Sequence, residues 1–268
     1  MSRNSLLLVD PNFSFSNNAD YHLIIKITND SFSYAIIDGQ MESVCILFDK
    51  QNCDNLVQDI QQAFSEDENL SRLFYSVKAA VHTSNYLFIP AEWYANENLS
   101  VYQNYFSDNA EIYAKANQKL GFETVFSIPE EIKVLLPEKT QFFPQSSPLI
   151  AMNKEVDKES ILIDFTANSF NLLYINKGNI QFQNHYQIDT DEEFNYFIVL
   201  IIDQLQLSDS IPVYLQGIIN EDDEVYNCLL KYFNQLCFLL PNGLENSELL
   251  ADMPKHYFSG LLALDSCE

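Results

Sequence analysis

The stretch Ile161–Ile180, ILIDFTANSFNLLYINKGNI, contains the pattern that decides the fold. Two apolar segments rich in β-forming residues, Ser160–Phe165 and Phe170–Ile175, are separated by a polar turn. A second turn, Asn176–Asn179, contains the asparagine and glycine that hairpins favour. With Ile180–Ile188 as the next strand, the pattern predicts three consecutive antiparallel strands.

The residues after these strands alternate between helical and strand patterns. We expect a helix over Asp191–Leu207, a strand over Ile211–Ile219, a helix over Asp222–Gln235, a short strand over Cys237–Leu240 and a last helix near Tyr257–Asp265. Three antiparallel strands are therefore followed by alternating helices and strands.

The first half of the chain has the same order. Strands are predicted at Tyr21–Thr28, Ser31–Ile37 and Glu42–Phe48, where Asp38-Gly39 is a hairpin signal. A helix over Cys53–Phe64 and a strand over Phe74–Val81 follow. The repetition of this order indicates two related lobes.

Further elements separate the two repeats. Strands are predicted at Tyr86–Ile89, Ala110–Ala116 and Phe122–Phe126, with helical character from Pro90 to about Phe106 and a short helix after Pro129. Gln141–Asp157, which contains prolines and serines, is the predicted junction. We therefore assign residues 1–145 to the first lobe and residues 146–268 to the second.

This order is that of a ribonuclease-H-like lobe, and two such lobes in tandem make the actin-like ATPase fold, an α/β architecture with mixed sheets flanked by helices. Ile161–Ile180 looks like the second phosphate-loop hairpin of actin-like ATPases, and Ile24–Gly39, IIKITNDSFSYAIIDG, resembles the first. The two hairpin sequences are similar in pattern to those of the bacterial pilus-assembly and cell-division members of this group. The chain thus resembles a bacterial family of unknown function in that superfamily.

The resemblance implies a nucleotide site whose usual residues are mostly absent. Each phosphate hairpin needs glycine, so that backbone amides can approach phosphates, and an acid near the divalent ion. The first turn, Thr28–Ser31, has no glycine, and Lys26 or Thr28 stands at the acid position, depending on the register. In the second hairpin Asp164 is retained, but Phe165–Asn168 replaces the glycine-rich turn.

Asp164 and Gly217 are the candidate cofactor-binding residues. Gly217 alone matches the paired glycines that such proteins carry on the adenine side. Each residue also has a structural explanation, since an aspartate at a strand end bonds its own turn and a glycine relieves a strand end. We predict no catalytic residue and no metal ligand, and we expect ATP and Mg²⁺ not to bind.

The charge of the chain supports this expectation. The sequence contains 14 Lys and Arg against 38 Asp and Glu, which gives a net charge of −24. Such a chain repels phosphates, so it is not expected to bind nucleic acid. The acidity keeps an aromatic-rich protein soluble or, alternatively, suits a basic partner surface.

The sequence lacks the motifs that identify several other classes of protein. Hydrolase, Walker, dinucleotide and zinc-protease motifs are absent. Neither a signal peptide nor a membrane-spanning segment is recognisable, so we expect a cytoplasmic protein without membrane insertion. The five cysteines lack metal-site spacing and are expected to be reduced.

Two regions could contact a protein partner. The predicted helix Asp191–Leu207 is apolar on nearly all sides, which indicates burial on both sides or an exposed patch for a partner or a homodimer. The aromatic residues near Trp93 and Tyr102 suit a core or an interface. We therefore expect a non-catalytic scaffold or regulatory protein with a degenerate nucleotide cleft. The alternative is a nucleotide- or small-molecule-binding ATPase or kinase-like protein that uses an atypical interlobe cleft.

Overall fold

The computed structural model describes residues 5–15, 20–94, 99–106, 110–152, 156, 158–240 and 248–267. The chain divides into two compact units. The first unit consists of residues 1–147 and 264–268, and the second unit consists of residues 148–263. Of the predicted junction, residues 153–155 and 157 lie outside the described part.

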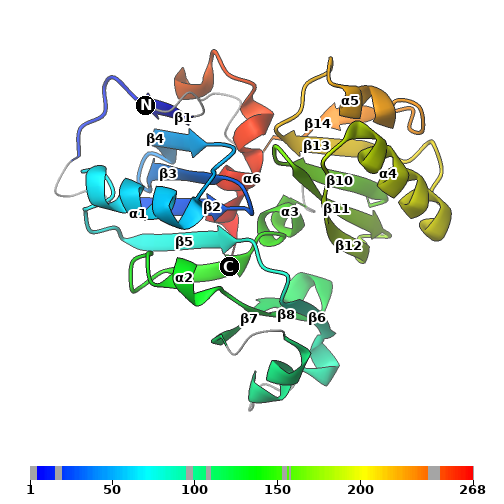
Figure 1. Ribbon diagram of the computed structural model, residues 1–268, viewed down its shortest axis with the longest axis horizontal. Coiled ribbons are helices and arrows are strands. Elements are labelled where there is room, and N and C mark those ends of the chain that lie inside the picture. Colours follow the sequence, from blue (N-terminus) through cyan, green and yellow to red (C-terminus); the bar gives the residue numbers. More distant parts are fainter. Residues whose placement is uncertain are drawn as a thin grey trace. The chain divides into compact units, whose positions relative to one another are not determined.

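The first unit is built on a six-stranded sheet with the order β1-β4-β3-β2-β5-β9 (Figure 1). Its strands are β1 Ser5–Val9, β2 Tyr21–Ile27, β3 Phe32–Asp38, β4 Ser43–Lys50, β5 Ser76–Val81 and β9 Gln141–Pro144. Its helices are α1 Leu56–Glu66 and α2 Glu130–Lys133, and α3 Ser147–Ala151 spans the sequence boundary between the units. A separate three-stranded sheet, ordered β6-β8-β7, contains β6 Tyr86–Pro90, β7 Ile112–Asn117 and β8 Phe122–Ser127.

The second unit is built on a five-stranded sheet with the order β12-β11-β10-β13-β14. Its strands are β10 Ser160–Phe165, β11 Ser169–Asn176, β12 Asn179–Gln187, β13 Val213–Gly217 and β14 Leu236–Phe238. Its helices are α4 Asp191–Leu205, α5 Glu224–Leu229 and α6 Ser259–Leu262, and α6 follows the 3-10 helix Lys255–Phe258.

The two sheets follow the same path. In each, three strands form an antiparallel meander, and the first strand of the meander then pairs in parallel with a later strand. A fifth strand pairs in parallel with the fourth, so β4-β3-β2-β5-β9 corresponds to β12-β11-β10-β13-β14. β1, antiparallel to β4, is an addition of the first unit. The repeated order predicted from the sequence is therefore present.

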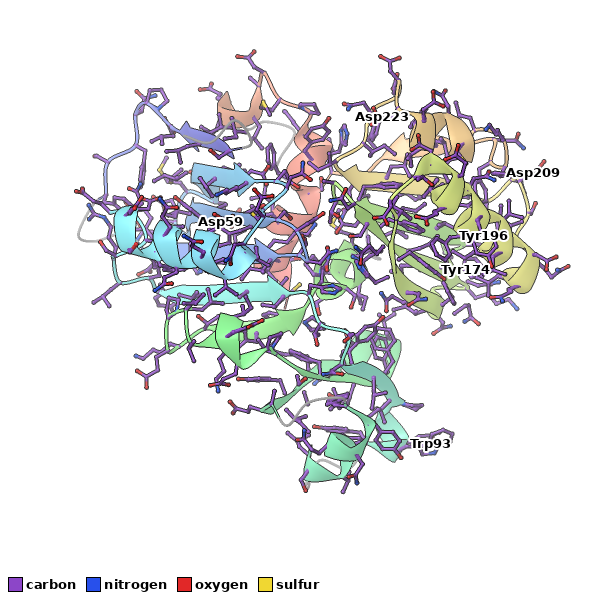
Figure 2. All side chains as sticks on the ribbon, in the orientation of Figure 1. Asp59, Trp93, Tyr174, Tyr196, Asp209 and Asp223 are labelled. Carbon is purple, nitrogen blue, oxygen red and sulfur yellow. The ribbon has the colours of Figure 1, made fainter. Side chains whose placement is uncertain are left out.

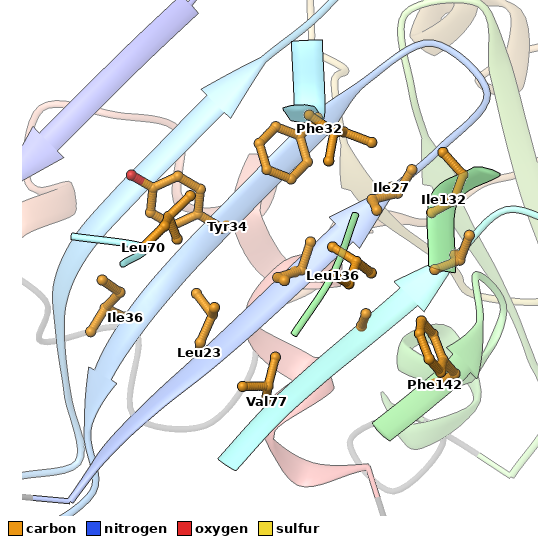
Figure 3. Packing of buried hydrophobic residues seen from close by; sticks show 14 of the residues in the cluster. Leu23, Ile27, Phe32, Tyr34, Ile36, Leu70, Val77, Ile132, Leu136 and Phe142 are labelled. Carbon is orange, nitrogen blue, oxygen red and sulfur yellow. The ribbon is translucent and has the colours of Figure 1, made fainter. Parts of the chain in front are cut away.

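Alternating residues of β2 and β3 form the core of the first unit (Figure 3). Leu23 and Ile27 of β2 pack with Phe32 and Ile36 of β3, and all four are fully or almost fully buried. α1 joins this core through Ile60, and its N-terminus is capped by the Asn55 side chain, which accepts from the Gln58 amide. Period-two strands, covered by α1 and by residues such as Ile132 of α2, thus account for this core.

The core of the second unit lies between its sheet and α4. Phe194 of α4 contacts Phe165 of β10 and Phe170 of β11, with ring centroids 5.7 and 5.0 Å apart. Hydrogen bonds of Thr190 and Glu193 cap the start of α4: the Glu193 amide donates to Thr190 Oγ1 at 3.2 Å, and the Glu193 carboxylate accepts from the Asp189 amide at 2.8 Å. Thr190 and Glu193 therefore cap the start of α4.

Several elements differ from the sequence-based expectation, among them the helix predicted over Asp222–Gln235, which extends only over Glu224–Leu229. Residues 141–144, predicted as part of the junction, form the edge strand β9, and β1 was not predicted at all. Within the region predicted as helical after Pro90, the structure describes two 3-10 helices, Ala91–Trp93 and Leu99–Tyr105, with residues 95–98 outside the described part. Among the described helices, none has the length and apolarity needed to span a bilayer.

Candidate functional site

The two hairpin turns that correspond to phosphate loops have the same construction. In the first unit the Thr28 amide donates to the Ser31 carbonyl at 3.0 Å, and in the second the Thr166 amide donates to the Ser169 carbonyl at 2.9 Å. The two hydroxyl groups of each turn also bond each other, at 2.6 Å for Thr28 and Ser31 and 2.8 Å for Thr166 and Ser169. The repeated Thr-x-x-Ser is visible in the sequence, but its meaning follows only from these bonds.

This correspondence determines the register that the sequence left open. Since Thr28 matches Thr166, the residue two positions earlier in each strand also matches, and Lys26 corresponds to Asp164. The acid position of the first hairpin is therefore occupied by a lysine, and the lysine is buried. A lysine at this position supplies no carboxylate oxygen to a divalent cation.

In the first turn, the side chain of Thr28 occupies the backbone amides of the turn. Thr28 Oγ1 accepts hydrogen bonds from the amides of Asp30 and Ser31, at 3.2 and 2.9 Å, and donates to Asp30 Oδ1 at 2.8 Å. Backbone amides in such a turn are the groups that would hold a phosphate oxygen. Here two of them are already bonded to Thr28.

Lys26 belongs to a row of polar residues that crosses adjacent strands. It pairs with Ser33 of β3, which in turn pairs with Asp49 of β4. Ser33 Oγ donates to Asp49 Oδ1 at 2.6 Å. Burial raises the pKa of Asp49, while the hydrogen bonds from Ser33 and Gln51 and the charge of Lys26 act in the opposite direction. The lysine is thus matched by an acid of its own unit.

Asp164 lies in the corresponding row of the second unit. It pairs with Asn171 of β11 on one side and with Gln216 of β13 on the other, and Asn171 pairs with His185 of β12. Asp164, Asn171 and Gln216 are almost completely buried. Asn171 Nδ2 and both polar atoms of Gln216 have no hydrogen-bond partner among the described residues. Unpaired buried amides are costly, so this row has unused capacity to bind a polar group.

Gly217 allows its strand to approach β10 closely. Its φ is +83°, and a Cβ atom at this position would lie 2.1 Å from the Phe165 carbonyl oxygen. The Ile218 amide donates to that oxygen at 3.0 Å, and the Ile219 amide donates to Gly217 at 3.0 Å. The glycine therefore has a structural role inside the second unit.

Residues from the 3-10 helix Lys255–Phe258 hold the loop after Gly217. His256 Nε2 lies 2.7 Å from the Ile219 carbonyl oxygen, and the Tyr257 hydroxyl donates to Asn220 Oδ1 at 2.7 Å. The His256 ring stacks on Phe238 with centroids 3.9 Å apart. Burial lowers the pKa of His256, although the bond to Ile219 acts against this. The loop that would contact an adenine is thus bound to its own chain.

A second polar cluster lies at the carboxyl ends of the parallel strands β2, β5 and β9. His82 Nδ1 lies 2.9 Å from Gln145 Oε1, and burial lowers the pKa of His82. Asp30 Oδ2, Gln145 Nε2 and Ser146 Oγ are buried atoms without a hydrogen-bond partner in the described part of the chain. This edge of a parallel sheet is where α/β proteins bind ligands. The cluster was not predicted, because its members come from three separate turns.

Among the described residues, side chains of the types that bind metal ions do not converge. Within the described ranges, no group of three or more His, Cys, Asp or Glu residues could hold a metal ion. All five cysteines are free thiols. Burial, with a hydrogen bond to Asp59, raises the pKa of Cys53 to about 12, so this thiol is a poor nucleophile.

The two regions considered for partner contacts are both partly exposed. On α4, Phe194, Ile198 and Ile201 are buried, but Tyr196 is 62% exposed and Val199 is 43% exposed. The helix is therefore not buried on both sides. In the three-stranded sheet region, Trp93 is 74% exposed and projects from the ribbon (Figure 2), whereas Tyr102 is buried.

Comparison with known proteins identifies the fold. A family model described as "Protein of unknown function (DUF3822)" matches residues 10–236. No curated protein has a significantly similar sequence. A Bacteroides thetaiotaomicron protein with actin-like ATPase fold and unknown function is 18% identical, with a TM-score of 0.74 over 96% of this chain and 99% of that chain.

Two further solved structures are similar at lower identity. The PilM–PilN type IV pilus biogenesis complex contains a chain that is 13% identical, with a TM-score of 0.58 over 91% of this chain and 97% of that chain. Ethanolamine utilization protein EutJ from Carboxydothermus hydrogenoformans is 9% identical, with a TM-score of 0.51 over 97% of this chain and 93% of that chain. The predicted actin-like ATPase fold, including its distant similarity to a pilus-assembly protein, is confirmed.

Proposed function

The chain belongs to this family of unknown function, and on that premise we propose that it is a non-catalytic actin-like scaffold or regulatory protein acting through protein–protein contacts. In this proposal its nucleotide site is degenerate, and it takes up neither ATP nor Mg²⁺. The observation that carries the proposal is the closed first turn, in which Thr28 Oγ1 occupies the amides of Asp30 and Ser31.

Charge gives independent support. Lys26 stands at the position that Asp164 takes in the second unit, so the first hairpin offers no carboxylate to a divalent ion there. A protein of net charge −24 also creates a repulsive field for a triphosphate. The loop after Gly217, bonded to His256 and Tyr257, would have to release these contacts to accept a base.

Similar folds do serve as parts of protein assemblies. PilM was solved in a complex with PilN, which supports a role in protein contacts for the same architecture. At 13% identity, the similarity supports a role in protein contacts and indicates no particular partner.

The experiment is thermal unfolding with and without Mg²⁺-ATP. A ligand present at about 100 times its Kd would stabilise the native state by about 2.7 kcal/mol. In a chain of this size that corresponds to an increase in Tm of roughly 5–10 °C. We expect no increase with Mg²⁺-ATP or Mg²⁺-ADP, and an increase of this size with either would refute the proposal.

A role in binding a small molecule is the second candidate. It is favoured by the row around Asp164, where Asn171 Nδ2 and both polar atoms of Gln216 lack partners. A ligand for this row would offer both donors and acceptors and carry no phosphate. Gln216→Leu distinguishes the two candidates: under the scaffold proposal it removes unpaired buried groups and leaves the Tm unchanged or higher. An increase in the Tm of the unsubstituted chain with a metabolite fraction, lost in Gln216→Leu, would favour the small-molecule role.

A further inference from the structure

The outer face of α4 carries an apolar pair bracketed by acids. Glu192, Tyr196, Val199 and Asp203 are all exposed and follow one another at spacings of four, three and four residues. Residues at these spacings lie along one side of a helix. The face therefore presents a tyrosine and a valine between two carboxylates.

The pair lies on the solvent side of a helix that is itself acidic. Tyr196 is 62% exposed and Val199 is 43% exposed, although both lie on a 15-residue helix whose opposite side supplies the core residues of the unit. α4 contains no lysine or arginine, while its first turn contains Asp191, Glu192 and Glu193. The field over the exposed side is therefore negative.

The tyrosine is held in place by neighbouring rings. Tyr196 packs edge-to-face against Phe197, with centroids 5.5 Å apart, and Phe197 contacts Tyr186 of β12 at 4.7 Å. Figure 2 shows Tyr196 on α4 of the second unit. A tyrosine that is already ordered loses little conformational entropy on binding, which suits it as an anchor for a partner.

A second copy of the chain does not fit this face. In a two-fold symmetric contact between two α4 helices, the antiparallel arrangement places Glu192 of one helix near Asp203 of the other. Like charges would then meet at both ends of the contact, and each chain also carries a net charge of −24.

We infer that the outer face of α4, centred on Tyr196 and Val199, is a docking surface for a basic amphipathic helix of a protein partner. Leucine-like side chains of such a helix would cover Tyr196 and Val199, while lysine or arginine on its flanks would meet Glu192 and Asp203. The assignment rests on the protein-contact role proposed above and adds the chemical class of the partner.

The test uses a fluorescent model peptide of about 15 residues and the full chain. The peptide carries leucine at the spacing of the α4 stripe and lysine elsewhere, and its binding is followed by fluorescence anisotropy at about 0.15 M salt. The variant Tyr196→Ser/Val199→Ser removes the apolar pair without changing the charge. The matched control, Leu73→Ser/Tyr75→Ser, removes two exposed apolar side chains of the first unit.

We expect the α4 variant to raise the Kd about tenfold or more and the control to leave it within about twofold. Equal effects of the two variants, or no effect of either, would overturn the inference, because the peptide would then bind only through general charge. A change from dimer to monomer in sedimentation of the α4 variant would also overturn it, since a second copy would be the occupant.

A second set of double variants, which changes charge and not apolar surface, tests the inference if the apolar variant does not fold. Glu192→Gln/Asp203→Asn should weaken binding and reduce its salt dependence more than Glu68→Gln/Glu138→Gln, which removes two exposed acids elsewhere. Equal effects of these pairs contradict the inference. Loss of the α4 preference refutes the docking surface alone, whereas stabilisation by Mg²⁺-ATP refutes the proposed function alone.

Discussion

Replacing Gly217 with alanine should destabilise the second unit through its contact with β10. The new Cβ would lie 2.1 Å from the carbonyl oxygen of Phe165 and 2.8 Å from its amide nitrogen. Both atoms belong to the backbone of a central strand, so no side-chain rotation can relieve the clash. β13 would have to move away from β10 at the point where the Ile218 amide bonds Phe165.

The expected cost has two parts. An L-residue at a φ of +83° costs roughly 1–2 kcal/mol relative to glycine. Loss of the buried hydrogen bond from Ile218 to Phe165 adds about 1–3 kcal/mol, because it leaves a buried group unpaired. Gly217→Ala should therefore lower the free energy of unfolding by about 2–5 kcal/mol.

Gly178→Ala is the matched control. Gly178 has a φ of +77°, but a Cβ there would have no atom within 4 Å, so only the backbone part of the cost applies. Thermal unfolding followed by circular dichroism should give a clearly larger decrease in Tm for Gly217→Ala than for Gly178→Ala. Equal decreases would refute the conclusion that Gly217 is required by strand packing.

Three further predictions concern the turns and buried titratable groups. Thr28→Ala should lower the free energy of unfolding by about 1–3 kcal/mol in urea unfolding, because two buried amides lose their acceptor, whereas Thr28→Ser should retain most of it. His256 is buried with a lowered pKa, so the unfolded chain takes up a proton that the native chain does not, and stability should fall as the pH decreases from 7 through about 6.5. His256→Gln should reduce that slope; an unchanged slope would contradict the reasoning. Cys53, whose pKa is raised to about 12, should react with a thiol reagent at neutral pH far more slowly in the native than in the unfolded chain, as mass spectrometry of the labelled peptides would show.

Much of the fold follows from local patterns in the sequence. The meanders at Tyr21–Phe48 and Ser160–Ile188 were predictable because apolar strands alternate with turns that contain the residues hairpins need. The helix α4 was predictable from its helical pattern and its length. These signals depend on neighbouring residues, so no tertiary contact was needed to read them.

The short edge strands could not be predicted in the same way. β9 contains only four residues, ends in Pro144 and continues into a segment rich in proline and serine, which indicates a linker. Residues 141–144 form a strand because they pair in parallel with β5, with Ala79 paired to Phe142 and Ala80 to Phe143. The position of the C-terminal segment also depends on a residue far away in the sequence, because Lys78 donates to the carbonyls of Asp265 and Cys267 at 2.6 and 2.7 Å.

The candidate site was only partly predictable. Asp164 and Gly217 stood out in the sequence, but the correspondence of Lys26 with Asp164 required the turn hydrogen bonds. Gln216 and His185 were missed because they join Asp164 only through the register of neighbouring strands. Whether Asp164 and Gly217 contact any ligand stays a prediction.

The most direct test of the proposal that the nucleotide site is degenerate is equilibrium dialysis of the full chain against labelled ATP with Mg²⁺. With Thr28 closing the first turn and Lys26 at the acid position, we predict no saturable binding up to about 1 mM nucleotide, a level at which even a weak site near 1 mM Kd would be half filled. Saturable binding of one ATP per chain with a micromolar Kd would contradict the account.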